Sequence, residues 1–281
     1  MNFSSPSASI YVPPGQTIEV ALPRITHLGI GAHQDDLEFM AFHGIEACYR
    51  QNDKWFGGVT CTNGAGSSRT GLYKDYSDDE MCAVRRREQE QAAVVGEYAA
   101  MVQLDYPSSS MKDPSNPSPV EDLLSILEAT RPEVVYTHNP ADKHATHVAV
   151  TAAVLKALRA LPPEAQPRQV LGCEVWRDLD WMLDADKTVL DVSGRPNLAA
   201  AIGGIFDSQI AGGKRYDLAV QGRRLANATF FDSHSVDGAE RPTRLSTVSC
   251  HVCQRGTSYI NQLAIIPTHA PPQALLTCRR K

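Results

Sequence analysis

Histidine and aspartate side chains of the kind that bind metal ions gather at two places in the chain. His33, Asp35 and Asp36 lie at the first place, and His144 and His147 lie at the second. Zinc hydrolases commonly bind the metal through three histidine or carboxylate ligands and leave one position open for water. His33 and Asp36 can supply two ligands, and one of the two later histidines, which share a face of a helix start, can supply the third. Asp35 is then left beside the metal with no ligand role, as a general base requires.

Each cluster alone has a simpler interpretation. A single histidine after a strand is usually a hydrogen-bonded loop residue. A pair of aspartates is usually a helix cap, since carboxylates favour the N-terminal end of a helix. The interpretation as a metal site depends on both clusters lying at the ends of strands in one sheet, so the positions of the strands decide between the two.

Apolar runs and helical periodicity predict the elements around these clusters. Strands are expected at residues 25–31, 56–61, 101–104 and 133–137, and helices at 36–50, 78–98, 118–130 and 144–161. Residues 111–119 carry three prolines and predict a loop. Ser118, Pro119 and Glu121 have the spacing of a capping box with proline at the first helical position, which predicts the start of the third helix.

Strands and helices alternate over the first 160 residues. This alternation favours an α/β fold, with a mostly parallel, Rossmann-like sheet and helices on both faces. Ligands in such sheets bind at the carboxyl ends of the strands. The His33 cluster directly follows the first predicted strand and the His144 cluster follows the fourth, so both are expected at one edge of the sheet. Together they predict a metal site.

Composition and charge limit the classes of partner. The chain has 281 residues, 42% hydrophobic and 21% charged, and its formal net charge of -5 argues against nucleic acid or an anionic membrane as partner. No stretch is long and apolar enough for a transmembrane segment, and residues 1–16 lack the layout of a signal peptide. The seven cysteines are an odd number, which suits a reducing compartment. We therefore expect a cytoplasmic protein, whose oligomeric state the sequence leaves open.

At the two clusters the sequence resembles the PIG-L or LmbE-like family, the N-acetylglucosaminyl-phosphatidylinositol de-N-acetylases. The family carries an Ala-His-Pro-Asp-Asp motif after its first strand, where this chain reads Ala32-His33-Gln34-Asp35-Asp36. The later His-Pro-Asp-His type motif is here His144-Ala145-Thr146-His147. These two motifs are specific in combination, and they carry the resemblance.

Weaker likenesses extend the resemblance over roughly residues 24–232. They are the loop Thr62-Asn63-Gly64, the helical run Arg85-Arg86-Arg87-Glu88 and the pair Ser208-Gln209. We therefore expect an N-terminal arm at 1–23 and an LmbE-like deacetylase domain at 24–232. Residues 233–281 show little periodicity and are expected to be irregular, either as a tail or as part of the same domain. Within them, Cys250-His251-Val252-Cys253 looks like half a zinc knuckle, but no second pair follows.

The resemblance implies a role for each residue of the two motifs. His33, Asp36 and His147 would hold Zn²⁺, although another divalent metal would also fit. Asp35 would be the general base that takes a proton from the metal-activated water and later delivers it. His144 would stabilise the oxyanion or protonate the leaving amine.

The resemblance also implies substrate contacts, which are less specific. Arg85 and Asn63 would bind the substrate. Arg85 would contact hydroxyl groups or a phosphate group of that substrate. The choice of Arg85 leaves the register open by one position within residues 85–87. The alternative for the whole run is that it forms a solvated helix face. Apart from the resemblance, Trp176, Trp181 and Tyr216 would suit a sugar pocket, but aromatic side chains are more often core.

Some positions depart from the family pattern. Gln34 replaces a proline, and Thr146 and Asp142 stand where some relatives have an aspartate and a tyrosine that assist the histidine or the oxyanion. Asp142 is expected to orient His144 instead, as groups behind an active-site histidine often do. His43, in the segment after the first motif, is expected to be a packing or surface histidine rather than a fourth ligand.

The function implied is that of a zinc-dependent hydrolase that removes an acetyl or related acyl group from an amino sugar or similar small molecule. A different amide, such as a sugar-thiol conjugate, is one alternative. A non-catalytic sugar-binding protein on the same fold is another, although such a protein would not need Asp35. A nucleotide-binding Rossmann enzyme is a third, because Gly29 and Gly31 start a dinucleotide fingerprint. In this chain, however, Gln34 occupies the third glycine position of that fingerprint, and Asp35 and Asp36 would repel a phosphate group.

Overall fold

A single eight-stranded sheet organises the chain. The computed structural model describes residues 1–230, 234–235 and 237–248, with strands in the order β1-β4-β3-β2-β5-β6-β8-β7. The strands are β1 (Ser9–Tyr11), β2 (His27–Gly31), β3 (Phe56–Thr62), β4 (Ala100–Tyr106), β5 (Val134–His138), β6 (Gln169–Cys173), β7 (Lys187–Asp191) and β8 (Pro242–Thr247). The five strands from β4 to β6 are parallel, whereas β1, β7 and β8 pair antiparallel at the two margins. The expected mostly parallel α/β fold is confirmed.

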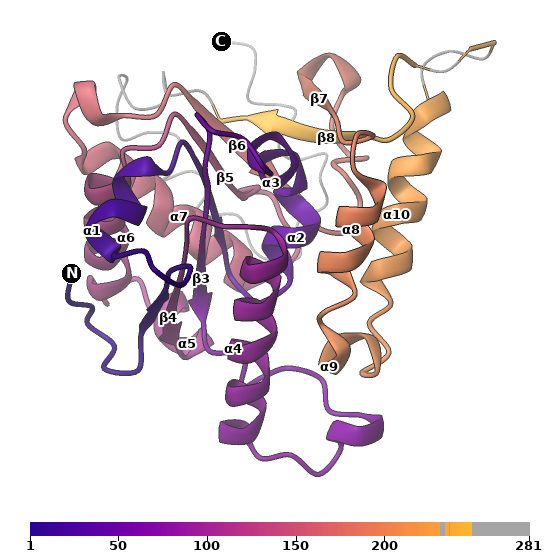
Figure 1. Cartoon of the computed structure of the whole chain (residues 1–281). Helices are drawn as coiled ribbons and strands as arrows, with labels where there is room; N and C mark the ends of the chain where they lie inside the picture. The colour runs from indigo at the N-terminus through magenta and orange to yellow at the C-terminus, as the bar shows by residue number, and fades with distance from the viewer. Residues whose placement is uncertain (231–233, 236, 249–281) are drawn as a thin grey trace.

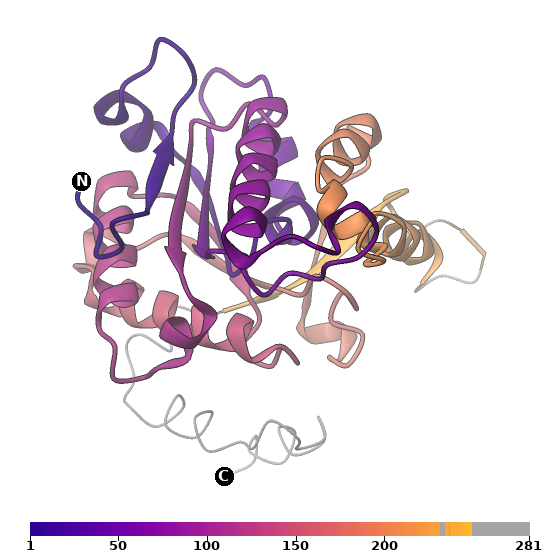
Figure 2. The same cartoon turned by 90° about the horizontal axis from the view of Figure 1, so that it is seen from below.

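Helices cover both faces of this sheet, as Figures 1 and 2 show from two directions. They are α1 (Ile18–Ala21), α2 (Asp36–Met40), α3 (Phe42–Cys48), α4 (Asp78–Val95), α5 (Ser108–Lys112), α6 (Ser118–Thr130), α7 (Ala145–Ala160), α8 (Pro196–Gly203), α9 (Asp207–Ile210) and α10 (Tyr216–Ala226). Short 3-10 helices lie at Leu22–Arg24, Gly71–Tyr73, Pro163–Ala165, Asp184–Asp186 and Asn227–Thr229. None of the helices in the described part of the chain has the length and apolar character needed to span a bilayer.

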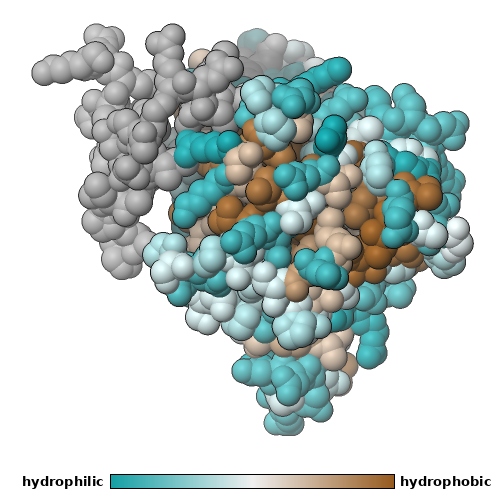
Figure 3. Space-filling view, turned by 90° about the vertical axis from the view of Figure 1, so that its left-hand side faces the viewer, coloured by the Kyte–Doolittle hydropathy of each residue, from teal (hydrophilic) through white to brown (hydrophobic). Residues whose placement is uncertain are grey.

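Two hydrophobic cores lie on opposite faces of the sheet. Leu28 and Ile30 of β2 point into the core shared with α6 and α7, while Leu37 of α2 packs in the other core, beneath α3, α8 and α10. The alternation of side chains along a strand separates these sets. Figure 3, which faces the α1 and α6 side, shows apolar side chains reaching the surface among hydrophilic ones.

The glycines of β2 allow α2 to pack closely on the sheet. A Cβ atom on Gly29 would lie 2.8 Å from Phe56 Cζ and 3.1 Å from Leu37 Cδ2. Because real side chains do not approach so closely, only glycine fits here without a shift of its neighbours. The close packing of α2 therefore explains Gly29, with no need for the dinucleotide-binding interpretation.

Several local predictions are wrong in detail. The helix expected over 36–50 breaks at Ala41 into α2 and α3. Ser118 is the first residue of α6 and makes no side-chain cap; the capping box lies instead at Ser77 and Glu80, at the start of α4. Part of the predicted loop 111–119 belongs to α5.

Both terminal segments contribute to the sheet more than expected. Residues 9–11, in the predicted N-terminal arm, add β1 to the edge strand β4. Residues 242–247, in the segment predicted to be irregular, form β8 between β6 and β7. The half zinc knuckle at 250–253 lies outside the described residues.

His27, at the start of β2, should make the stability of the fold sensitive to acid. Burial, together with the charges of His43 and Lys54, lowers its pKa to about 4. In the unfolded chain the histidine pKa is about 6.5, so between about pH 6.5 and 4 the unfolded chain binds more protons than the folded chain. The contribution of His27 to the free energy of unfolding should therefore be complete above about pH 6.5 and should be lost as the pH falls toward 4.

The measurement is the free energy of urea unfolding between pH 7 and 4, in parallel with His27→Asn. The asparagine amide replaces the ring nitrogen that lies 2.9 Å from Thr26 Oγ1 but does not titrate in this range. The variant should lose less stability on acidification than the wild type. If the free energy of unfolding falls equally steeply with pH in both proteins, His27 does not contribute to the acid sensitivity.

Candidate active site

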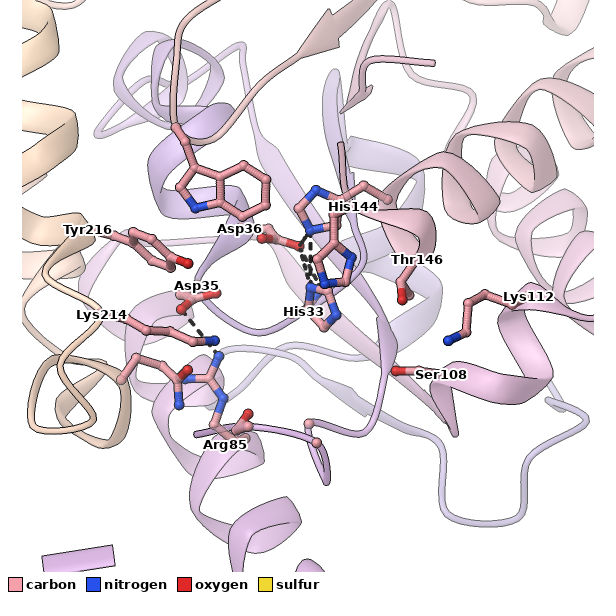
Figure 4. A pocket seen from close by; sticks show the side chains of 16 residues that line it. His33, Asp35, Asp36, Arg85, Ser108, Lys112, His144, Thr146, Lys214 and Tyr216 are labelled. Carbon is pink, nitrogen blue, oxygen red and sulfur yellow. Dashed lines mark hydrogen bonds and ion pairs between the residues drawn. The ribbon is translucent and has the colours of Figure 1, made fainter. Parts of the chain in front are cut away.

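The two motifs meet at the carboxyl ends of neighbouring strands. β2 pairs directly with β5 in parallel, with Ile30 opposite Thr137. The segment after β2 carries His33 and leads into α2, and the segment after β5 carries His144 and leads into α7. The side chains of both segments point into one cavity (Figure 4). The structure thus brings together what the sequence predicted to lie together.

Three donor atoms of the predicted metal site lie at the spacing of a metal coordination shell. His33 Nδ1 is 3.3 Å from Asp36 Oδ2 and 3.2 Å from His147 Nε2, and the last two atoms are 3.6 Å apart. Donors held about 2.0–2.1 Å from a tetrahedral zinc ion are about 3.3 Å from one another. The donor set therefore fits a zinc-like ion without rearrangement of the fold.

The same region offers two further combinations of donors. Within the described residues, His33, His144 and His147 form one group whose ligand atoms lie within 4.8 Å of one another, and Asp36, His138 and His147 form another. His147 belongs to both groups and to the predicted triad. It is therefore the residue on which every version of the metal site depends.

Asp36 is held in place by the backbone as well as by the histidines. Its Oδ2 accepts hydrogen bonds from the backbone N–H groups of His33, at 2.7 Å, and Ala32, at 3.1 Å. Burial raises the pKa of Asp36, but His147 and His138 lower it more strongly, and the net pKa is well below the ordinary value. Asp36 is thus an ionised carboxylate in a buried site, as a metal ligand must be.

Asp142 orients His147, which corrects the expectation that it orients His144. Its Oδ2 lies 3.0 Å from His147 Nδ1, and its Oδ1 accepts only the backbone N–H of His144, at 2.8 Å. Because Nδ1 is engaged by the carboxylate, His147 Nε2 is turned toward Asp36 and His33. This carboxylate–histidine pair is the usual support of a metal-binding histidine.

Replacing Asp142 with Asn should weaken metal binding by about 10- to 100-fold, the usual effect of removing such a support. The amide would keep the size of the side chain but not its charge, so His147 would be a poorer and less well oriented ligand. Competition with a chromophoric chelator measures the affinity. Asp53→Asn, an exposed aspartate remote from the cavity, is the matched control. Equal affinity in both variants would contradict the role of Asp142.

Asp35 has the position expected of a base rather than a ligand. Its backbone has φ +91°, a left-handed conformation that few residues other than glycine, asparagine, aspartate and histidine adopt and that is often found at functional sites. Its Oδ2 lies 3.4 Å from Arg85 Nη2, and its N–H donates to Gln89 Oε1 at 3.2 Å. Burial raises its pKa and Arg85 lowers it, with a net rise.

Arg85 is the arginine of the run that lines the cavity, and it is only 1% exposed. Its guanidinium group contacts Asp35, the carbonyl of Gln34, Glu88 at 3.2 Å and Ser208 Oγ at 3.4 Å. Ser208 in turn donates to Glu88 from its N–H and its hydroxyl. Arg85 is therefore no part of a solvated helix face, and a chain of contacts links Asp35 to α9.

The cavity has a volume of about 280 Å³. Its walls are formed by His33, Asp35, Asp36, Gly64, Gly66, Ser67, Arg85, Ser108, Lys112, His144, Thr146, His147, Trp176, Gln209, Lys214 and Tyr216. Asn63 is not among these residues; its Oδ1 accepts the N–H of Ala65 and shapes the loop that contributes Gly64.

Residues far along the chain complete the cavity, and most of them carry no local signal in the sequence. Tyr216 and Lys214 lie on one side of the cavity in Figure 4 and face the motif residues, and Trp176 also lines the cavity. The ring of Trp176 stacks on His147 at 5.2 Å with an interplanar angle of 11°. In the sequence, only the aromatic character of Trp176 and Tyr216 marks them as candidates for the cavity wall.

His138 is the buried residue that the sequence interpretation passed over. It ends β5, and its Nε2 accepts the N–H of Ala32 at 2.8 Å and lies 3.2 Å from Asp36 Oδ2. Its ring stacks on His147 with centroids 3.8 Å apart. The position of a histidine as the last residue of a strand, at the ligand-binding edge of the sheet, was the signal that could have identified it.

His144 lies at the open side of the metal site. Its ring meets His33 edge-on at 5.0 Å and lies 4.6 Å from the ring of His147. Burial and the charges of His147 and His33 lower its pKa to about 4. Its imidazole faces the cavity, where it can contact a substrate beside the metal (Figure 4).

Comparison with known proteins agrees with the motifs. Residues 28–158 match the family model of PIG-L, described as GlcNAc-PI de-N-acetylase. The sequence matches no curated protein.

Several solved structures share the fold. N,N'-diacetylchitobiose deacetylase from Pyrococcus horikoshii has a TM-score of 0.61 at 15% identity, over 84% of this chain and 88% of that one. The 4-carboxy-2-hydroxymuconate hydratase of Pseudomonas putida KT2440 has a TM-score of 0.63 at 18% identity, over 83% of this chain and 98% of that one. A40926 pseudoaglycone deacetylase has a TM-score of 0.60 at 14% identity, over 80% of this chain and 97% of that one. At these identities the likeness establishes the fold.

Proposed function

We propose that this chain, which carries a PIG-L family domain over residues 28–158, is a metal-dependent hydrolase that removes an N-acetyl or related acyl group from an amino sugar or a similar small molecule. The family match and the deacetylases among the structural neighbours support a deacetylase or, more broadly, a hydrolase. The observation that carries the finer proposal is the set of three donors spaced for a metal, with Asp35 beside them at the wall of one cavity.

His33, Asp36 and His147 would hold the metal, and two imidazoles with one carboxylate suit zinc. When bound, the metal supplies Lewis acidity that polarises the amide carbonyl and lowers the pKa of water toward about 7. The buried donors also exclude bulk solvent from one side of the reacting group, which strengthens each polar contact there.

Asp35 accepts the proton of the attacking water at its carboxylate and later delivers it to the leaving nitrogen. Arg85 holds this carboxylate through its Nη2 contact, and the left-handed backbone at Asp35 fixes the direction in which the side chain leaves the chain. Arg85 thereby orients the base, and it can reach a substrate from the same wall.

His144 supports the reaction from the opposite side of the metal site. Its ring lies beside His33 and faces the cavity, where it can donate a hydrogen bond to the oxygen on which negative charge develops. Trp176 and Tyr216 supply flat apolar surface that can pack against a sugar ring. The arrangement therefore provides a base, an oxyanion donor and a substrate wall, with no need for a serine or cysteine nucleophile.

The experiment is to measure amine release from N-acetylglucosamine and N,N'-diacetylchitobiose by protein loaded with stoichiometric zinc. Release is expected from at least one substrate, and it should stop on addition of a chelator. Protein that binds zinc yet releases no amine from these or other N-acetylated amino sugars would contradict the proposal.

A second candidate reaction is the hydration of an unsaturated carboxylic acid, as in the hydratase among the structural neighbours. The same donors and the same base would add water to a carbon–carbon double bond, and Lys112 and Lys214 of the cavity could bind carboxylates. Loss of the ultraviolet absorbance of a conjugated carboxylated dienoate, with no amine release from any amide, would favour hydration.

A further inference from the structure

Positive charge lines the cavity in excess of negative charge, although the protein as a whole is acidic. Three cationic side chains, Arg85, Lys112 and Lys214, face two carboxylates, Asp35 and Asp36. The whole chain carries a formal net charge of -5. A cleft whose charge is opposite to that of its protein concentrates ligands of the complementary sign, which here are anions.

The two carboxylates are already engaged. Asp35 Oδ2 lies 3.4 Å from Arg85 Nη2, and Asp36 Oδ2 lies within 3.6 Å of three histidine nitrogens. Within the described part of the chain, neither Lys112 nor Lys214 forms an ion pair with a carboxylate. The charge of Lys112 is therefore left without a carboxylate partner in the described part of the chain, whereas the charge of Lys214 acts on Asp35.

The two lysines differ in their surroundings. Lys214 lies beside Asp35 and Arg85 in Figure 4, and its Nζ is 5.9 Å from the ring centroid of Tyr216. Lys112 lies on the opposite wall, at the end of α5, and its ammonium group points toward Ser108 and Thr146 (Figure 4). Lys112 is thus the cation that stands apart from every carboxylate of the site.

Three uncommitted donors come together on this wall. The hydroxyl groups of Ser108 and Thr146 and the ammonium group of Lys112 all line the cavity, and none makes a side-chain hydrogen bond within the residues that the structure describes. Thr146 is buried and comes from the start of α7, whereas the other two come from α5. Lysine offers donors and no acceptor, so its natural partner is an oxyanion.

We propose that the substrate of this site carries an oxyanion, a carboxylate or a phosphate, that binds Lys112, Ser108 and Thr146 on the α5 wall of the cavity. The proposal rests on the proposed deacetylase function and narrows its substrate class to anionic N-acylated amino sugars. The oxyanion binds on the wall opposite Lys214 and Tyr216, so that the reacting amide lies between the two walls at the metal site.

The test compares kcat/KM for N-acetylglucosamine with that for N-acetylglucosamine 1-phosphate, N-acetylglucosamine 6-phosphate and N-acetylmuramic acid. At least one anionic substrate should be preferred by about 10-fold or more, the usual effect of a hydrogen bond to a charged group. The phosphate and carboxylate arms identify which oxyanion the wall accepts. Equal values for the neutral and all the anionic substrates would overturn the proposal.

Lys112→Met tests which wall carries the preference. Methionine keeps much of the length of the side chain but not its charge, so the preference for the anionic substrate should fall by about 10-fold. Lys156→Met, which removes an exposed lysine of α7 outside the cavity, is the matched control and should keep the preference. Loss of the preference in Lys214→Met but not in Lys112→Met would overturn the assignment to the α5 wall.

A binding measurement separates this inference from the proposed reaction. Calorimetric titration of metal-loaded Asp35→Asn protein with the same four compounds requires no turnover. Tighter binding of an anionic compound without amine release by the wild type would retain the anion site and reject the deacetylase. Amine release with equal affinities for all four compounds would retain the deacetylase and reject the anion site.

Discussion

Replacing Asp35 with Asn should lower kcat/KM for amide hydrolysis by about 10²- to 10⁴-fold, the usual contribution of a general base. The amide cannot accept the proton of the attacking water. Asparagine is the appropriate substitution because it tolerates the left-handed backbone, here with φ +91°, better than most residues. The loss should therefore report the missing base and not a distorted chain.

Metal content is the control for this variant. Since Asp35 is not one of the three spaced donors, Asp35→Asn should bind the metal as tightly as the wild type. Asp75→Asn, at an exposed aspartate outside the cavity, should retain full activity. A metal-loaded Asp35→Asn protein with most of the wild-type activity would reject Asp35 as the base.

Removal of the metal should abolish activity and destabilise the fold. At a free metal concentration 100 to 1,000 times the dissociation constant, binding stabilises the folded chain by about 2.7–4.1 kcal/mol. A chelator should therefore lower the melting temperature as well as stop turnover, and metal addition should restore both. Unchanged stability and activity after demonstrated metal removal would rule out a metal enzyme.

Single substitutions distinguish the possible donor sets. His147→Ala should lose the metal in every case, because His147 belongs to each group of donors. His144→Ala should keep the metal and lose activity if His33, Asp36 and His147 are the ligands. If His144→Ala loses the metal and Asp36→Ala keeps it, the group formed by His33, His144 and His147 is the site instead.

The meeting of the two motifs could be predicted because it depends on local sequence and one topological rule. Each motif directly follows an apolar run, and parallel strands present their carboxyl ends at one edge. For this reason His33 and His147, which are 114 positions apart in the sequence, lie side by side, with 3.2 Å between His33 Nδ1 and His147 Nε2. The rule does not predict side-chain orientation, and the expected contact of Asp142 with the His144 side chain is replaced in the structure by one with His147.

The missed elements depend on distant contacts. The sequence of β8, Pro242–Thr247, lacks a clear alternation of apolar and polar residues, and it becomes a strand by pairing with β6 and β7. The same holds for the cavity wall, because Tyr216, the first residue of α10, lies near the motif residues in the fold but far from them in the sequence. The break between α2 and α3 at Ala41 has no proline or glycine at that position to mark it in the sequence.

The cavity is assembled from two stretches of chain. The proposed metal donors all lie between His33 and His147, within the matched segment 28–158, whereas Trp176, Gln209, Lys214 and Tyr216 come from beyond it. The wall that carries Trp176 and Tyr216 can therefore change while the two motifs and the α5 wall with Lys112 stay the same. For protein engineering, residues 174–216 are thus one segment to graft or randomise when a new acylated substrate is sought, while the two motifs and the α5 wall are kept unchanged.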